Sequence, residues 1–420
     1  MRTKRMVIGF IAILLVLPTL ASATGTAEEA DPDAVQLTVW FGRQDFIPDD
    51  AFAGFHERYP NIRVNVDVVP LEEALEQASM AIAAGHGPDI LQIDSRRLAP
   101  LAEAGYLMDI TEILDAWEAE DPESFNAISG TGWEHAIHYG TPHGVALSAG
   151  PFNHVYRMDW LEEAGLSVPE TWEEVLDVAR ALNEGEHRRG YALRGPTSSV
   201  WFHSHYQAMG GQFDEIGVIQ LDSEPGIYAL EFYQTLVREE LVSEDVLAWG
   251  SGDMRAAFIT GRAAQAPIGT NIFPDIQEEL EYGVEWGAIP PPYREGAQDQ
   301  WQYSSLGWPH LVTSSTDHPE EAGLVLRYLA EHDQAMSIAV RYQPTTVLSV
   351  YEDPAFIEAN PWSEEFIAPF DEMVRVPSHE RHEAMNDLIM DAMGEVMSNM
   401  DADPAEVAAR YQAQLDALYD

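Results

Sequence analysis

The first third of the chain alternates short apolar strands with amphipathic helices. Residues 37–41 are expected to form a buried strand, and residues 62–68 place isoleucine or valine at every second position. A third short apolar strand is expected over 89–93. Strands that alternate with helices in this way are typical of parallel βαβ units, so we predict an α/β fold with ligands beyond the carboxyl ends of its strands. The expected helices cover 52–59, 71–84 and 98–104.

Residues 139–174 carry closely spaced signals for a strand and two helices. A turn at Pro142 leads into a β-rich run, and the short helix that follows is expected to end at Gly165. Thr171 and Glu174 form a capping box, in which the hydroxyl and the carboxylate each bind a free backbone amide of the next helix. By itself, this pattern predicts a strand–helix–helix connection in an α/β protein.

The amino terminus has the pattern of a signal peptide. Basic residues at 2, 4 and 5 precede an uncharged apolar run that ends in small residues at 21–23. We expect residues 1–23 to be a signal peptide cleaved near Ala23 and residues 24–33 to be a flexible leader, with an uncleaved anchor as the alternative. The sequence has no cysteine, and therefore no disulfide and no lipid-acceptor residue of a lipoprotein. We expect an exported protein that diffuses freely in the periplasm.

The composition is strongly acidic. The sequence has 71 Asp and Glu residues against 22 Lys and Arg, a formal net charge of −49, and Lys4 is its single lysine. Loss of three basic residues with the signal peptide leaves 19, all arginine, and a net charge of −52. Such self-repulsion is tolerated where salt screens it, because the Debye length falls to about 3 Å at 1 M. We expect a high-salt external medium, and no nucleic acid or anionic membrane as a partner.

The sequence lacks the motifs of common enzymes. It has no Gly-x-Ser-x-Gly elbow, Walker loop, dinucleotide fingerprint or His-Glu-x-x-His motif. Histidines gather at 135, 138 and 143 and at 203 and 205, but no further ligands stand at recognisable metal-site spacing. We therefore predict no catalytic residue, no cofactor and no metal, and a secreted polysaccharide hydrolase remains as an alternative from another class.

Several aromatic residues stand at predicted strand ends or in predicted loops. Sugar rings place their C–H faces on aromatic rings, while planar polar side chains hold their hydroxyl groups. Polar side chains that could hold hydroxyl groups follow two of the strands. The pattern therefore favours a carbohydrate ligand. For most of the tryptophans, packing in the core is the alternative role. The aromatic residues are Trp40, Trp201, Phe202, Trp301, Tyr303 and Trp308, and the polar ones Arg43, Gln44, Asp94, Arg96 and Arg97.

Taken in order, several short patterns resemble the family 1 extracellular solute-binding proteins, the maltose-binding-protein-like receptors of carbohydrate ABC importers. The similarity covers nearly the whole chain after the signal peptide. The patterns lie at 37–40, 52–64, 87–90, 98–107, 139–174, 210–211, 258–264 and 319–322.

The resemblance implies a two-lobed periplasmic-binding-protein fold of type II, in which a solute is enclosed between two α/β lobes. Closure on the solute creates the form that the membrane permease recognises, and the receptor is expected to be a non-enzymatic monomer. The implied lobes are 34–145 with 288–342 and 146–287 with 343–420, and the implied crossings lie near 142–147 and 286–290.

The resemblance also implies ligand contacts at the cleft. They are Trp40, Arg43 and Gln44; Asp94, Arg96 and Arg97; Gly150 and Pro151; Gly269, Thr270 and Asn271; and Gly307 and Trp308, with Trp201, Phe202 and His203 from a variable region. The chain departs from the family at Arg157-Met158, where the family often has Asn-Lys, and at Asn271, where an aromatic residue is frequent, so a maltose-like ligand is not implied.

A receptor of the same fold for a different solute is the main alternative. Polyamines, phosphodiesters and metal chelates are candidate solutes of this kind. A cationic ligand would need several carboxylates in the cleft, whereas the candidate loops offer three arginines and one aspartate. This composition favours a neutral polyol or an anionic sugar.

Overall fold

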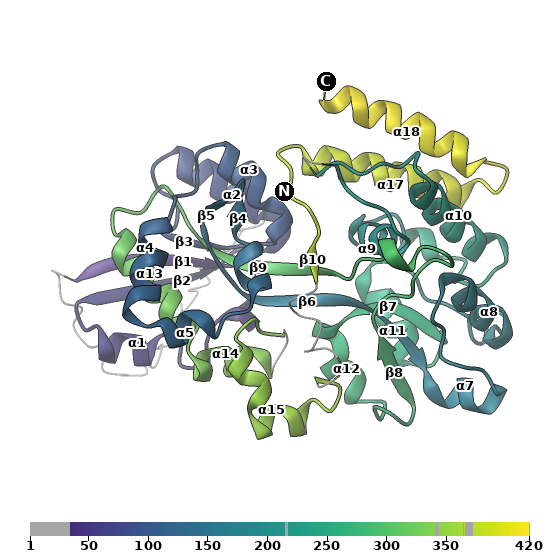
Figure 1. Ribbon diagram of the computed structural model, residues 1–420, viewed down its shortest axis with the longest axis horizontal. Coiled ribbons are helices and arrows are strands. Elements are labelled where there is room, and N and C mark those ends of the chain that lie inside the picture. The colour runs from purple at the N-terminus through teal and green to yellow at the C-terminus, as the bar shows by residue number, and fades with distance from the viewer. Residues whose placement is uncertain (1–33, 215–216, 341–343, 364, 366–372, 420) are drawn as a thin grey trace, which may run out of the picture.

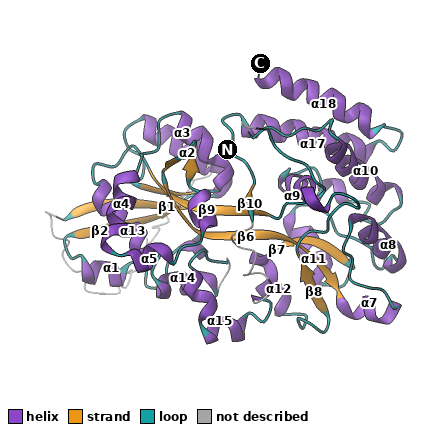
Figure 2. Cartoon of the chain, in the orientation of Figure 1, coloured by secondary structure: helices purple, strands orange, loops and turns teal. Residues whose placement is uncertain are grey.

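A computed structural model describes residues 34–419 apart from 215–216, 341–343, 364 and 366–372, so the predicted signal peptide and leader lie outside the described residues. Two α/β lobes lie side by side along the long axis of the molecule, and strand β6 (Gly144–Arg157) runs from one into the other (Figure 1). Helices surround the strands in both lobes (Figure 2). The predicted α/β class is confirmed.

The remaining strands are short, and most of them belong to one mixed sheet. They are β1 (Val35–Phe41), β2 (Ile62–Val68), β3 (Ile90–Gln92), β4 (Ile137–His138), β5 (Thr141–Pro142), β7 (Gln265–Gly269), β8 (Trp286–Ile289), β9 (Ser304–Val312) and β10 (Val374–Arg375).

The helices differ in length between the two halves of the chain. Those up to β6 are α1 (Ala53–Arg58), α2 (Leu71–Ala83), α3 (Leu98–Glu103), α4 (Thr111–Glu120), α5 (Pro122–Asn126) and α6 (Gly130–Glu134). Those after β6 are α7 (Met158–Ala164), α8 (Trp172–Leu182), α9 (Val200–Ala208), α10 (Glu224–Arg238), α11 (Ser251–Ile259), α12 (Phe273–Gln277), α13 (Pro319–Leu329), α14 (His332–Ala339), α15 (Pro354–Ala359), α17 (His382–Ser398) and α18 (Pro404–Tyr419).

The first lobe contains the predicted parallel βαβ arrangement. Strand β1 pairs in parallel with β2 on one side and with β3 on the other. Leu37, Val39 and Phe41 are buried on one face of β1, as the alternating pattern predicts. Because β1 and β3 are parallel, the loops that follow them emerge at the same edge of the sheet.

Strand β6 forms the first crossing between the lobes. Its first part, through Pro151, pairs antiparallel with β9, and its second part, from Phe152, pairs antiparallel with β7 and β8. All of its residues are buried except the half-buried Gly150. Gly144 is required for this pairing, because a Cβ atom there would lie 1.9 Å from the carbonyl oxygen of His310 on β9. The predicted crossing near 142–147 falls on the beginning of this strand.

The chain returns to the first lobe through β9. Strand β8 pairs with the second part of β6, and the segment after it still contacts the second lobe, where Arg294 Nε donates to Met209 O at 3.2 Å. Strand β9 then pairs with β3. We propose that the return crossing lies between Trp301 and Ser304 rather than near 286–290; the lobe boundaries otherwise stay a prediction.

The strand–helix–helix prediction for residues 139–174 is confirmed. Strand β6 leads into α7, which ends at Gly165 in the left-handed conformation with a φ of 70°. At the start of α8, Thr171 Oγ1 accepts from the Glu174 amide at 3.1 Å and Glu174 Oε2 accepts from the Thr171 amide at 3.3 Å. Both halves of the capping box are therefore present.

The surroundings of Trp201, Phe202 and His203 differ from the prediction. We expected a loop or strand end, but these residues lie in the first turn of α9. Every residue of this helix is buried. A helix that is enclosed on all sides has no polar face and so shows no helical period in its sequence, which is why the pattern was misread.

Candidate functional site

A cavity of about 550 Å³ lies between the two lobes. From the first lobe its wall includes the loop after β1, the short 3-10 helix η2 (Ser95–Arg97) after β3, and strand β9. From the second lobe the wall includes the first turns of α9, α11 and α17 and the turn after β7. The crossing strand β6 contributes residues at the point where it passes from one lobe to the other. A solute held here would touch both lobes.

Most of the predicted ligand contacts line this cavity. Gly150 and Pro151 lie on the crossing strand, at the change of partner from β9 to β7. The predicted residues in the wall are Arg43, Asp94, Arg96, Arg97, Gly150, Pro151, Trp201, Gly269, Asn271 and Trp308.

The other predicted contacts lie away from the wall. Trp40 packs beneath α2 and α3, and Gln44 is exposed beside the loop. Phe202 and His203 are fully buried and do not line the cavity. Thr270 is buried behind the turn that carries Asn271. Gly307 is covered by the ring of His135, 2.3 Å from where a Cβ atom would stand.

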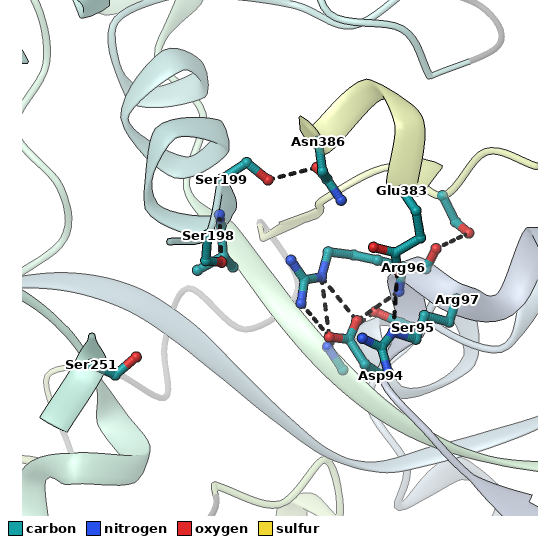
Figure 3. A network of polar contacts seen from close by, with 12 residues as sticks. Asp94, Ser95, Arg96, Arg97, Ser198, Ser199, Ser251, Glu383 and Asn386 are labelled. Atoms are coloured by element: carbon teal, nitrogen blue, oxygen red, sulfur yellow. Dashed lines mark hydrogen bonds and ion pairs between the residues drawn. The ribbon is translucent and has the colours of Figure 1, made fainter. Parts of the chain in front are cut away.

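Asp94 and Arg96 form the central ion pair of the first-lobe wall (Figure 3). Arg96 Nε lies 3.0 Å from Asp94 Oδ1, Arg96 Nη2 also contacts the carboxylate, and the Arg96 amide donates to Oδ1 at 2.9 Å. Burial disfavours the Asp94 carboxylate, but the charge and hydrogen bonds of Arg96 outweigh this and hold the pKa of Asp94 below its usual value. The pair fixes the turn that places the neighbouring Arg97 at the cavity.

The wall of the first lobe is tied to the carboxyl-terminal part of the chain. Arg97 Nε lies 3.4 Å from Glu383 Oε1, at the start of α17. Ser378 Oγ donates to the carbonyl of Arg96 at 2.7 Å and accepts from the amide of Ala99 at 2.9 Å. Since α17 packs with α10 and α18 in the second lobe, these contacts join the two lobes at one end of the cleft.

Several residues of the cavity wall were missed by the sequence analysis. Ser199 Oγ donates to Asn386 Oδ1 at 2.6 Å and so connects the start of α9 to α17 (Figure 3). Arg194 could have been found, since basic residues are few beside the acidic ones in this chain and Arg194 precedes a Gly-Pro turn. The missed polar residues are Arg194, Thr197, Ser198, Ser199, Ser251, Arg255, His382, Glu383 and Asn386.

The described residues give no indication of a metal site. Among the described residues, no group of three or more His, Asp or Glu side chains is placed to hold a metal ion. Several buried histidines instead contact neutral polar groups of the core, as His135 does with Ser95 Oγ at 3.1 Å and Ser305 Oγ at 3.0 Å. Burial lowers the pKa of His205 to about 3, with a smaller contribution from His154. In the part of the chain that the structure describes, no helix has the length and apolar character needed to cross a membrane.

The sequence profile of the family described as bacterial extracellular solute-binding protein matches residues 42–336. The chain belongs to this family. A binding protein of Brucella abortus (strain 2308) is 24% identical over 323 residues, which cover 74% of this chain and 75% of the relative.

Solved structures share the fold. The GacH receptor of Streptomyces glaucescens, solved unliganded and with acarbose, superposes with a TM-score of 0.76 at 21% identity, covering 92% of this chain and 98% of the receptor. An ABC transporter solute-binding protein of Agrobacterium radiobacter in complex with ribitol has a TM-score of 0.77 at 19% identity, covering 92% and 99% of the two chains. The predicted two-lobed, maltose-binding-protein-like fold is confirmed.

Proposed function

We propose that this family member binds a carbohydrate between its two lobes and delivers it to the permease of an ABC importer. The observation that carries the proposal is a cavity between the lobes that combines aromatic rings with planar polar side chains. Trp308 is half-buried and packs against Phe46, with ring centroids 5.5 Å apart. Trp201 meets Phe152 edge-to-face at 4.9 Å. These contacts hold both indoles in place at the wall.

The polar side chains of the wall supply the second element of sugar recognition. Asp94 and Asn271 offer acceptors, and Arg43 and Arg97 offer donors. The acarbose and ribitol complexes of similar folds support a polyhydroxylated ligand for this cavity. Because the wall comes from both lobes, binding would favour their closed arrangement, which the permease would recognise.

The proposal includes the place and state of the protein. We infer an exported, periplasmic and monomeric receptor without catalytic activity, which works with membrane permease subunits. The family assignment and the basic, then apolar, then small-residue order of positions 1–23 support export. Size-exclusion chromatography with light scattering would contradict the monomer if it returned twice the chain mass.

A ligand screen tests the proposed function. The mature protein should show a raised melting temperature with at least one mono-, di- or oligosaccharide or polyol, because a ligand at about 100 times its Kd adds about 2.7 kcal/mol of stability. Trp308→Ala should weaken that binding about tenfold, which is about 1.4 kcal/mol of lost ring contact. Isothermal titration calorimetry measures the change.

The matched control is Trp160→Ala. Like Trp308, Trp160 is half-buried, but it does not line the cavity. The guanidinium groups of Arg157 and Arg188 lie 4.2 and 4.4 Å from the centre of its ring. Its replacement should leave the Kd unchanged. A transition moved by a polyamine or metal chelate and by no carbohydrate would favour the other-solute receptor, and release of sugar from a polysaccharide would favour the hydrolase.

We also infer that the protein works in a high-salt medium. The chain has 71 acidic residues against 22 basic ones, and at low ionic strength the surplus carboxylates repel one another. Dialysis from about 2 M to about 0.05 M NaCl removes most of the screening by salt. We expect it to lower the melting temperature by several degrees. Calorimetry of the ligand-free protein measures this, and an unchanged midpoint would exclude the inference.

A further inference from the structure

Helix α17 presents polar side chains to the cavity at two of its buried positions. Eight residues of this helix are buried, and the six apolar ones pack in the hydrophobic core of the second lobe. The other two, His382 and Asn386, both line the cavity, and Met390 lines it one turn further along. Side chains four residues apart lie on the same face of a helix, so these three form one stripe along the wall.

Asn386 is held in a defined orientation by the start of α9. Ser199 Oγ donates to Asn386 Oδ1 at 2.6 Å, and the Asn386 nitrogen points away from Ser199 (Figure 3). A separation of 2.6 Å suits an O–H···O bond, whereas an N–H···O bond is usually about 2.9 Å long, so the amide oxygen and not the nitrogen faces the serine. Because Ser199 is only 2% exposed, water does not compete for this contact.

The amide nitrogen of Asn386 is left to bind a solute. Asn386 is 7% exposed, and within the described part of the chain its Nδ2 atom has no hydrogen-bond partner. This nitrogen carries two N–H donors and cannot accept. Burying such donors without a partner destabilises a protein, and a ligand oxygen in the cavity would relieve that destabilisation.

His382 keeps this part of the wall uncharged. The residue is 1% exposed, and neither of its ring nitrogens has a hydrogen-bond partner among the described residues. Burial, reinforced by the charge of Arg96, lowers the pKa of His382 to about 3, so its ring is neutral at neutral pH. A neutral ring beside amide donors suits the hydroxyl groups of a sugar.

We infer that Asn386 selects the sugar that this receptor binds, by donating from its amide nitrogen to the oxygen of a ligand hydroxyl group, and that Ser199 positions the amide. The inference rests on the proposed receptor function and assigns its specificity to a residue near the end of the chain. A sugar without an oxygen at that place would leave the buried donors unpaired, and a site built to hydrogen-bond a hydroxyl rejects the analogue that lacks it. Removal of the Ser199 hydroxyl would let the amide turn and present its oxygen instead.

Isothermal titration calorimetry tests the role of Asn386, with glucose, galactose, xylose and maltose as probes at about 2 M NaCl. Asn386→Leu keeps a side chain of similar size but removes both donors, and it should weaken binding of the tightest of these probes about tenfold or more. Asn360→Leu is the matched control. Asn360 is also a buried asparagine, at 4% exposed, but it lies outside the cavity wall, so its replacement should lower the melting temperature without changing the Kd.

Derivatives of the tightest probe test the direction of the hydrogen bond. Fluorine in place of a hydroxyl group accepts weakly and donates nothing, whereas hydrogen in the same place does neither. At one position of the sugar, the monodeoxy derivative should therefore bind the parent protein about tenfold more weakly than the sugar, and the monodeoxyfluoro derivative should bind with an intermediate Kd. In Asn386→Leu the sugar and both derivatives should bind alike, because the donor that distinguishes them is gone.

Ser199→Ala tests the positioning residue. It should weaken binding of the sugar less than Asn386→Leu does. It should also narrow the difference between the monodeoxy and monodeoxyfluoro derivatives, because the freed amide also presents its oxygen. Ser204→Ala is the control, since Ser204 is buried in α9 and lies outside the cavity wall. Ser199→Ala also serves as the test variant if Asn386→Leu does not fold.

The outcomes separate this inference from the proposed function. Equal Kd values for the parent and Asn386→Leu, or a variant that weakens the sugar and its monodeoxy derivatives equally, would overturn the role of Asn386 and leave the carbohydrate receptor intact. A monodeoxyfluoro derivative that binds no better than the monodeoxy one at every position would overturn the donor direction. A parent protein that binds none of the probes and no other carbohydrate of the ligand screen would overturn the proposed function itself.

Discussion

Replacing Asp94 by asparagine is expected to lower the free energy of unfolding by about 3 kcal/mol, because the substitution leaves the buried Arg96 guanidinium without a counter-charge. The Asp94 side chain is 6% exposed and that of Arg96 is 16% exposed, so water replaces little of the lost interaction. The loss should persist in molar salt, since a buried pair is screened much less than an exposed one. Urea denaturation of the ligand-free protein measures the change.

Two further variants identify the cause. Glu383→Gln removes a carboxylate that also faces an arginine of the wall, but the Glu383 side chain is 57% exposed, so the cost should stay below about 1 kcal/mol. Asp94→Asn combined with Arg96→Met should recover much of the lost stability, because it removes the unpaired charge as well. A double variant no more stable than Asp94→Asn would show that packing of the turn, and not charge, is responsible.

Local patterns in the sequence predicted the scaffold well. Contacts within a few residues along the chain decide the alternation of apolar residues in β1 and β2. They also decide the helix end at Gly165 and the helix start at Thr171. Such features leave a period or a cap in the sequence and can be found without knowledge of the tertiary structure. The resemblance to a family then supplied the order of the two lobes.

Only some of the residues that line the cleft were predicted from the sequence. A physical reason separates those that were predicted from those that were missed. Loops that directly follow strands β1, β3 and β7 reach the cavity because the sheet brings their ends together. The start of α17 reaches it only because the last part of the chain folds back over the second lobe and contacts η2 through Ser378. Nothing around His382 in the sequence marks this tertiary contact.

The direction in which a side chain points from its strand or helix also limited the prediction of the site residues. Trp40 and Arg43 stand three residues apart, yet the indole packs beneath α2 and α3 while the guanidinium lines the cleft. Trp201 and Phe202 are neighbours in α9, and only the first reaches the cavity. Alternation on a strand and the 100° step of a helix assign adjacent residues to different sides, so a motif locates a loop more reliably than it selects the contacting residues.

Acidification from pH 7 to pH 5 is expected to destabilise the protein by at least about 5 kcal/mol, because several histidines are buried as neutral rings. Burial lowers the pKa of His135 and His205 to about 3 and that of His154 and His310 to about 4. An exposed histidine titrates near about 6.5, so below that pH the unfolded chain takes up protons that the folded chain does not. The stability is therefore fully present above about pH 6.5 and falls as the pH decreases toward the folded values.

The size of the destabilisation follows from the distance between pH 5 and the ordinary histidine pKa of about 6.5. Each such group can cost up to about 2 kcal/mol at pH 5, about 1.4 kcal/mol for each pH unit below 6.5. Carboxylates titrate near about pH 4 and so relieve little of their mutual repulsion in this window. His135→Gln should reduce the pH slope by close to one proton, whereas substitution of the exposed His86 by glutamine should leave it unchanged. Urea unfolding at pH 7, 6 and 5 measures the slope, and a free energy of unfolding that is constant or higher at pH 5 would contradict the neutral, buried state of these rings.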